Sequence, residues 1–187
     1  GFSTGSTIAY IPMLFNGAFG GSYNAAFYVQ NIGDSSTTYT IQYYDSTGTL
    51  NCTKTGESLA PSASRGYWVP ASTCDSGSLP AGWVGGVMIT SDQPIVTVGR
   101  PHIDSQITTY GGSGHGFTMQ VLPMLFKGAF GGLYNSAFYI QNTGSDTSET
   151  NFNYYDTNGI SVCQKTNVSI PPKASLGVWV PAATCDT

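Results

Sequence analysis

The chain has 187 residues, of which 10 are acidic and 6 basic, so its formal charge is −4 with histidine neutral. Charged residues make up 9% of the chain, against about a quarter of an average soluble domain. This scarcity of basic side chains argues against nucleic-acid binding, which requires phosphate neutralisation. No apolar run approaches the roughly 20 residues that a membrane helix needs, so we expect no membrane insertion. The 24 glycines and 10 prolines favour short strands and turns over helices.

An internal repeat divides the chain. Residues 12–15 (PMLF) return as residues 123–126, an offset of 111, and the register then continues without a gap. About half of the aligned positions are identical, and the same offset relates 17–21 to 128–132, 27–31 to 138–142, 43–45 to 154–156, 68–71 to 179–182, and 74–75 to 185–186. A unit of about 110 residues is too long for a solenoid turn and suits an independent domain. The sequence therefore predicts a tandem array of globular modules.

The repeat also sets the expected domain boundaries. We predict a first module over residues 1–110, a glycine-rich linker over 111–118 and a second module over 119–187. The second copy ends at the counterpart of Ser76, so it has no equivalent of residues 77–110. We therefore expect the second module to lack its last two strands, which either further sequence or a neighbouring subunit would supply.

Alternating polar and apolar residues predict β-strands. In the first copy the expected strands cover residues 8–15, 27–29, 39–43, 65–69, 83–90 and 95–99. Residues 45–48 (DSTG) predict a tight turn, repeated with Asn-Gly at 156–159, and a further turn is expected at 91–94. No window of twelve residues shows a helical period. About seven strands per unit at this spacing predict an all-β chain of tandem immunoglobulin-like antiparallel β-sandwich modules.

The four cysteines form two pairs with the same spacing. Cys52 and Cys74 are 22 residues apart, as are Cys163 and Cys185. A repeated even count predicts the disulfides Cys52–Cys74 and Cys163–Cys185, and hence an extracellular or cell-surface location. Closing a loop of this size stabilises the fold by about 3 kcal/mol in the chain-entropy model. Zinc is the weaker alternative, because there is no Cys-x-x-Cys and the two histidines lie elsewhere.

No cluster of residues predicts catalysis, so we expect no enzyme, no cofactor and no metal. His102, Asp104 and Ser105 are close in sequence, but residues so near one another on an extended segment do not converge on one reacting atom. The glycines of residues 17–21 lie between strands without a following Lys-Ser, so they favour a tight connection over a phosphate loop. The repeated acids are better explained as turn formers than as paired catalytic carboxylates: Asp45, Asp156, Asp75 and Asp186.

Neighbouring aromatic residues on a strand must point to opposite faces. We expect Trp68 and Trp179 in the core, because the repeat keeps them while Tyr67 becomes Val178. Four tyrosines are expected to point outward: Tyr28, Tyr44, Tyr139 and Tyr155. Exposed tyrosines with few charges suit protein interfaces and also sugar stacking. We favour an interface, because no acids or amides are organised around them.

Two stretches carry a family resemblance. One is FYVQNIG at residues 27–33 followed by YYDSTG at 43–48, and the other is LPAGWVG at 79–85 leading to TSDQPI at 90–95. They resemble the tandem immunoglobulin-like repeats of secreted bacterial cell-surface proteins, in which Gln-Asn-x-Gly ends a strand and Tyr-Tyr-Asp-x-x-Gly makes a hairpin. The resemblance covers most of the first unit and two thirds of the second. It implies an extracellular structural or adhesive array without catalytic residues, and the cysteine pair departs from its commoner cysteine-free pattern.

The repeat, the low charge and the incomplete second copy together predict self-association into a polymer. We expect an extracellular structural protein, a repeat subunit of a surface filament, fibre or stalk, assembled by strand complementation between neighbours. The expected donor is the N-terminal strand, through Ile8, Tyr10 and Ile11, although the first module needs this strand itself. The alternative is a carbohydrate-binding or adhesin module that binds surface glycans.

Overall fold

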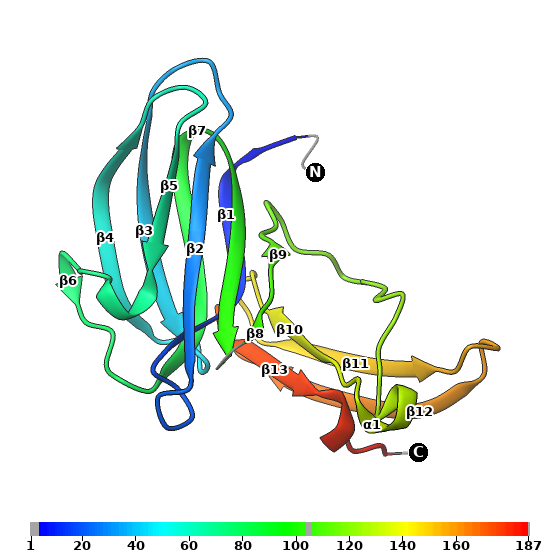
Figure 1. Ribbon diagram of the computed structural model, residues 1–187. Coiled ribbons are helices and arrows are strands. Elements are labelled where there is room, and N and C mark those ends of the chain that lie inside the picture. Colours follow the sequence, from blue (N-terminus) through cyan, green and yellow to red (C-terminus); the bar gives the residue numbers. More distant parts are fainter. Residues whose placement is uncertain (1–3, 104–105, 187) are drawn as a thin grey trace.

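The computed structural model describes residues 4–103 and 106–186 (Figure 1). These residues form an all-β protein built around a curled antiparallel sheet, as the alternating pattern predicts. The first copy contains β1 (Ser6–Asn16), β2 (Tyr23–Asn31), β3 (Thr37–Asp45), β4 (Leu50–Leu59), β5 (Ser64–Trp68), the 3-10 turn η1 (Val69–Ala71), β6 (Ser76–Gly77) and β7 (Trp83–Ile103). After it come β8 (Gln106–Ile107), β9 (Tyr110–Gly111), the short turn α1 (Ala129–Gly132), β10 (Ala137–Gln141), β11 (Ser148–Tyr155), β12 (Ser161–Ile170), β13 (Ser175–Trp179) and η2 (Val180–Ala182).

Strand β7 is the centre of the sheet. Its first half pairs with β1 on one edge and with β3 on the other, so Ile89 lies opposite both Ala9 and Ile41. Its second half pairs with β2 and with the short strands β8 and β9. The sheet curls so that β2 and β3 face each other across the core, where the rings of Phe27 and Tyr43 lie 6.1 Å apart. One long strand therefore joins the two halves of the curl.

The chain folds back on itself at residues 91–94, where a turn was expected (Figure 1), but the strand assignment of β7 continues through this reversal from Trp83 to Ile103. The strand pairs with β3 up to Ser91 and with β2 from Ile95. Pro94, between them, has no N–H to donate, but its carbonyl accepts a hydrogen bond from the backbone nitrogen of Ile32 at 2.9 Å. Proline is tolerated in a strand at such an irregular point. The Asp-Gln-Pro sequence thus marks the place where the strand changes partners.

The core lies inside the curl of the first copy. Fully buried side chains alternate along β2, β3 and β7, and β1 contributes two, one on each side of its register shift: Phe27, Val29, Ile41, Tyr43, Val87, Ile89, Ile11 and Leu14. Each large apolar side chain buried in this way contributes about 1.5–3 kcal/mol to stability. Burial also raises the pKa of the Tyr43 hydroxyl to about 12.

The tryptophans were wrongly assigned to the core. Trp68 is 43% exposed and Trp179 is 51% exposed. The adjacent Tyr67 turns inward instead and stacks on Phe27 with ring centres 4.9 Å apart. A residue type kept by the repeat therefore marks an exposed position on this strand.

The second copy forms two separate ladders within the described residues, β10 with β13 and β11 with β12. They correspond to the pairs β2–β5 and β3–β4 of the first copy. Residues 119–126, the counterpart of most of β1, form no strand in the described structure. Strand β1 is held by β7, and no part of the sequence aligned with the second copy corresponds to β7.

Part of the expected linker packs on the first copy. Strand β9 pairs with β7, and Ser113 forms a bridge with Tyr10 of β1. The backbone nitrogen of Gly112 donates to the carbonyl of Thr97 at 2.9 Å. These bonds fix the path by which the chain leaves the first copy.

Candidate functional site

In the first copy, β7 pairs with one edge of β2 and one edge of β3. In the second copy, the corresponding edges belong to β10 and β11. Strand β2 lies between β5 and β7, and β3 lies between β4 and β7. Their counterparts β10 and β11 each have one pairing partner among residues 4–103 and 106–186. The other edge of each strand offers backbone N–H and C=O groups to an incoming strand.

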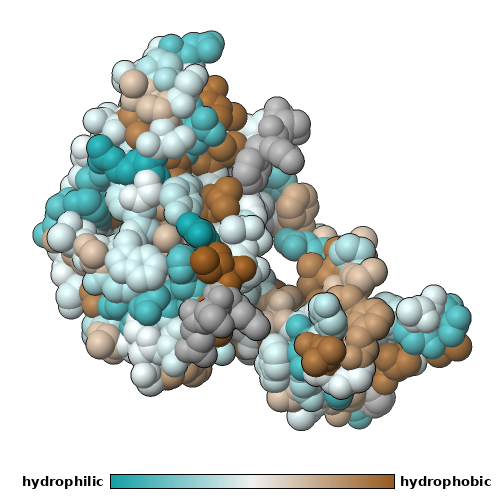
Figure 2. Space-filling model, viewed as in Figure 1, coloured by the Kyte–Doolittle hydropathy of each residue, from teal (hydrophilic) through white to brown (hydrophobic). Residues whose placement is uncertain are grey.

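Apolar side chains of residues 117–124 in the second copy are exposed. Met13 is 3% exposed in the first copy, whereas its counterpart Met124 is 69% exposed, and Ile11 at 0% corresponds to Leu122 at 48%. Further exposed apolar residues of the same segment are Phe117, Met119 and Val121. Figure 2 shows hydrophobic surface, in brown, on the part of the molecule formed by the second copy. Exposed apolar surface of this kind marks interaction sites in soluble proteins.

The strand expected as a donor is paired within its own copy. Ile8, Tyr10 and Ile11 lie on β1 opposite Thr90, Met88 and Val87 of β7, respectively, and Ile11 is fully buried. Donation of β1 to a neighbour would require it to leave β7, and this role remains a prediction.

The four tyrosines expected to point outward occupy different surroundings in the two copies. Tyr28 is 39% exposed, and its hydroxyl accepts a hydrogen bond from Arg100 at 3.2 Å. Its counterpart Tyr139 is half-buried. The relation is reversed for Tyr44, which is half-buried, and Tyr155, which is 62% exposed. Contact between the two copies accounts for part of this difference.

The second copy packs against β1 of the first. The ring of Tyr139 meets that of Phe15 edge-on, with centres 6.4 Å apart. The methyl group of Met13 lies over Gly177, where an added β-carbon would be 3.3 Å from it. Strand β1 therefore contacts both strands of the β10–β13 ladder.

Two glycines of the first copy allow close approach at the same junction. A β-carbon at Gly48 would overlap the carbonyl oxygen of Pro172. One at Gly86 would lie 2.6 Å from both the side-chain nitrogen of Gln141 and the hydroxyl of Ser175. Any larger residue at either position would push the two copies apart.

The turn that contains Gly48 is built as its sequence predicts. The carboxylate of Asp45 accepts hydrogen bonds from the backbone nitrogens of Thr47 at 2.9 Å and Thr49 at 3.0 Å. Gly48 has a φ of 91°, which a residue with a side chain rarely adopts. Asp156 forms the same turn in the second copy, where it accepts from Asn158 and Ile160. The predicted turn role of these two acids is confirmed.

Each copy also presents a phenylalanine in its glycine-rich GAFGG loop, which precedes β2 in the first copy and β10 in the second. Phe19 and Phe130 both have a φ of 52° and are 69% and 71% exposed, respectively. The glycines around them supply a tight connection, closed in the first copy by the hydrogen-bonded pair Ala18 and Tyr23. These exposed phenylalanines were not recognised in the sequence, although the repeated GAFGG motif contains them.

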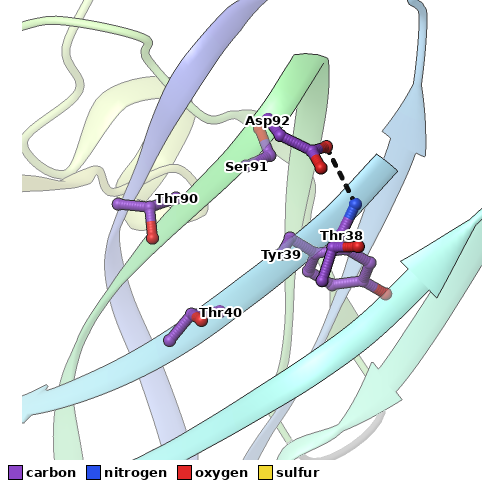
Figure 3. Close-up of a pocket in the computed structure, with 6 residues that line it drawn as sticks. All are labelled: Thr38, Tyr39, Thr40, Thr90, Ser91 and Asp92. Carbon is purple, nitrogen blue, oxygen red and sulfur yellow. Dashed lines mark hydrogen bonds between the residues drawn. The ribbon is translucent and has the colours of Figure 1, made fainter. Parts of the chain in front are cut away.

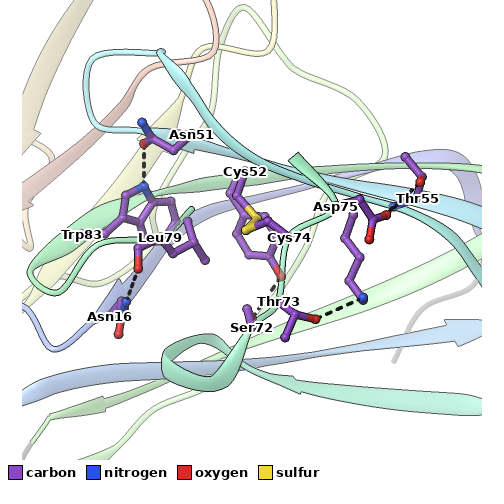
Figure 4. The surroundings of a disulfide bond; sticks show 12 residues. Asn16, Asn51, Cys52, Thr55, Ser72, Thr73, Cys74, Asp75, Leu79 and Trp83 are labelled. Atoms are coloured by element: carbon purple, nitrogen blue, oxygen red, sulfur yellow. Dashed lines mark hydrogen bonds between the residues drawn. A yellow bond between two sulfur atoms is a disulfide. The ribbon is translucent and has the colours of Figure 1, made fainter. Parts of the chain in front are cut away.

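Both predicted disulfides are confirmed. Cys52–Cys74 ties β4 to the segment after η1, and Cys163–Cys185 makes the same link between β12 and the segment after η2. Figure 4 shows the first bridge beside Trp83, whose indole nitrogen donates to Asn51 at 2.9 Å.

The acids after the second cysteines do not form turns, so this prediction was wrong. Asp75 accepts hydrogen bonds from the backbone nitrogen and the hydroxyl of Thr55, at 2.7 and 2.8 Å, and so fastens the disulfide loop to β4 (Figure 4). Asp186 repeats this contact with Thr166 and also pairs with Lys165 at 2.6 Å. The hydrogen bond from Lys165, followed by those from Thr166, lowers the pKa of Asp186 to about 2.

A shallow polar hollow lies over β3 and β7 (Figure 3). It is lined by Thr38, Tyr39, Thr40, Thr90, Ser91 and Asp92. The carboxylate of Asp92 is already engaged, since it accepts from the Thr37 hydroxyl at 2.6 Å and from the Thr38 backbone nitrogen at 2.9 Å. Those bonds lower the pKa of Asp92. The hollow is thus a hydrogen-bonded strand junction rather than an enclosed ligand cavity.

Of the three neighbouring residues His102, Asp104 and Ser105, the structure describes His102. His102 lies on β7 beside Trp68, with ring centres 5.1 Å apart. Asp104 and Ser105 lie outside the described residues. Within the described ranges, His, Cys, Asp and Glu side chains form no group of three that could hold a metal ion. No helix in that part of the chain is long and apolar enough to cross a bilayer.

Comparisons with known proteins give no family assignment. No family model matches the chain, and no curated protein matches it. Among solved structures, the crystal structure of Thermotoga maritima 1070 is similar to 59% of this chain over 96% of its own length, with 14% sequence identity and a TM-score of 0.45.

Proposed function

We propose that this chain is an extracellular structural protein whose tandem immunoglobulin-like β-sandwich modules associate into a surface filament, fibre or stalk. The observation that carries the proposal is the second copy, where β10 and β11 each have one pairing partner among the described residues and Met124 is 69% exposed. Unpaired strand edges recruit strands from neighbours, and exposed apolar surface favours association. Strand complementation between molecules is the expected way of covering them.

Two further features support this function. The chain carries charge on 9% of its residues, so its outward strand faces repel one another little when many copies pack together. Each copy also has a disulfide, which suits an oxidising exterior and stabilises a domain exposed to harsh conditions.

Sedimentation velocity and negative-stain electron microscopy of the purified, oxidised chain test the proposal. We expect oligomers that grow with protein concentration and persist at high salt, because apolar and backbone contacts rather than ion pairs would hold them. A monomer at every concentration, with no polymer on the grid, would contradict the proposed function.

A carbohydrate-binding or adhesive role is the alternative. It is favoured by Trp68 and Trp179, which lie exposed at the same position of the two copies and could stack on sugar rings. Glycan-array binding that is lost on Trp68→Ala, in a chain that does not self-associate, would favour this role over the structural one.

A further inference from the structure

Two surfaces form the junction between the copies, one from each copy. The surface that the second copy contributes also occurs on the first copy, where it contacts no other copy among the described residues. In the second copy this surface, which we call the docking face, consists of Tyr139, Gln141, Pro172, Ala174, Ser175 and Gly177. The aligned residues of the first copy are of the same type at every position: Tyr28, Gln30, Pro61, Ala63, Ser64 and Gly66. The first copy therefore has the same chemical surface as the one the second copy uses to contact it.

The burial of the two docking faces differs. Ser175 is 4% exposed and Ala174 is 1% exposed in the junction. Their counterparts are less covered, since Ser64 is exposed and Ala63 is half-buried among the described residues. The docking face of the first copy is thus formed but has no occupant within the described part of the chain.

Residues of β5 that belong to the docking face are identical in the two copies. Ser64 and Gly66 point outward and are identical in β13. Arg65 and Tyr67 point the other way and are replaced by Leu176 and Val178. The glycine is kept because the ring of Tyr28 or Tyr139 lies against it in each copy, whereas the identity of the exposed Ser64 indicates binding.

The residues of the other half of the junction, the receiving face, also recur in the sequence of the second copy, although residues 119–126 form no strand there. In the first copy it includes Met13, Phe15 and Gly48; the aligned residues Met124, Phe126 and Gly159 are of the same type. Met124 is 69% exposed, and no described atom lies within 4 Å of a β-carbon built on Gly159. Gly86 lies beyond the aligned region, so this receiving face consists of the 156–159 turn and the 124–126 segment.

We propose that the junction within the chain is repeated between molecules. The docking face of the first copy of one molecule packs on the receiving face of the second copy of the next molecule, so the partner is a second copy of this chain. Such a head-to-tail contact uses two different surfaces and does not close on itself, which produces a filament. This inference rests on the proposed function and adds the surfaces through which the subunits join.

One variant blocks each half while leaving the monomer intact. Ser64→Arg places a long charged side chain on the docking face, at an exposed position of the free molecule. Gly159→Asn fills the open space above the 156–159 turn, and asparagine tolerates its φ of 79°. Each should weaken association by at least about tenfold, as obstruction of a central interface residue does.

The matched controls make the same changes away from both faces. Ser58→Arg alters a serine of β4 that is exposed in both copies. Gly56→Asn alters a positive-φ glycine whose counterpart in the second copy is already Asn167, at a φ of 54°. Both controls should associate like the native chain, and circular dichroism and melting temperature should show that all four variants are folded.

Mixing the two blocked variants gives the decisive measurement. Ser64→Arg retains a receiving face and Gly159→Asn retains a docking face, so in sedimentation velocity each alone should be monomeric and the mixture should form a 1:1 dimer that grows no further. If the native chain associates and both variants associate equally well, the proposed surfaces are wrong although the structural function stands. If the native chain is monomeric at every concentration, the proposed function fails as well.

Discussion

Polar side chains of the first copy connect β3, β4 and β5. The hydroxyls of Tyr39 and Tyr67 lie 2.5 Å apart, and Tyr67 donates to the carboxylate of Glu57 at 2.8 Å. Arg65 pairs with the same carboxylate at 2.5 Å. The second copy replaces the whole group together, with Thr150, Val168, Leu176 and Val178. Since all four residues are replaced together, they act as one unit. This unit links β5 to β3 and β4, two strands with which β5 does not pair.

Glu57 makes the stability of this unit depend on pH. Burial opposes ionisation, but hydrogen bonds from Tyr67, Arg65 and Lys54 outweigh it and lower the pKa of Glu57 from 4.5. Because the folded pKa is below the unfolded one, the carboxylate stabilises the fold above pH 4.5, and this contribution is lost as the pH falls through the folded pKa. Glu57→Gln should therefore lower the free energy of unfolding by about 1 kcal/mol near neutral pH.

The difference between Glu57→Gln and the native chain should vanish in acid. Melting curves at a series of pH values test this, since other carboxylates titrate equally in both proteins. Glu149→Gln, on the exposed face of β11, is the matched control and should change little at any pH. A deficit that persists unchanged to about pH 3 would mean that the glutamate acts through packing rather than charge.

Truncation of Tyr67 should destabilise the fold more than truncation of the neighbouring Trp68, although tryptophan is the larger residue. Tyr67 packs on the core and stacks on Phe27, so Tyr67→Ala should cost about 3 kcal/mol in the free energy of unfolding. Trp68 is 43% exposed, so Trp68→Ala should cost about 1 kcal/mol or less. Denaturant titration measures both, and a larger loss for Trp68→Ala would show that the tryptophan is structural.

At the scale of elements, the two disulfides should differ in their resistance to reduction. Cys52 is 1% exposed and belongs to the core, and its partner Cys74 packs against that core. Cys185 is exposed, and Cys163 is half-buried. Because thiol–disulfide exchange requires access to a sulfur, Cys163–Cys185 should be reduced about tenfold faster under native conditions.

Alkylation and mass spectrometry after brief exposure to dithiothreitol identify which bridge opens. Denatured protein is the control, since the two loops have equal length and should then be reduced at similar rates. Faster reduction of Cys52–Cys74 in the native protein would contradict the assignment of this bridge to the core.

The elements could be predicted where a local pattern determines them. The alternation around Ile41, the Asp-Gly turn ending at Gly48 and the cysteine spacing each depend on nearby residues and are confirmed. The reversal at residues 91–94 was also predicted, but not the continuity of β7 through it, because a proline inside a strand and a proline in a turn look alike until the strand's partners are known. The exposure of Trp68 likewise depends on which face of β5 meets the core.

The candidate surface of the whole molecule was predictable only in outline. The repeat indicated that the second copy lacks strands, but not that β7 is the strand on which β1, β2 and β3 all depend. The junction could not be seen either, because it joins Gly48 to Pro172 and Met13 to Gly177, which are far apart in the sequence. Once the structure is known, a comparison of the aligned residues of the two copies reveals the surfaces that form this junction.

Across the whole molecule, the second copy should be less stable than the first. Val29 and Ile41 are fully buried on strands paired along both edges, whereas their counterparts Ile140 and Phe152 are half-buried on strands with one partner among the described residues. In hydrogen exchange measured by mass spectrometry, β10 and β11 should therefore be at least about 100-fold less protected than β2 and β3. Aligned peptides of similar sequence serve as internal controls for intrinsic rates. Equal protection in dilute monomer would contradict this, whereas protection of β10 and β11 that rises with concentration would place the added contacts on those strands.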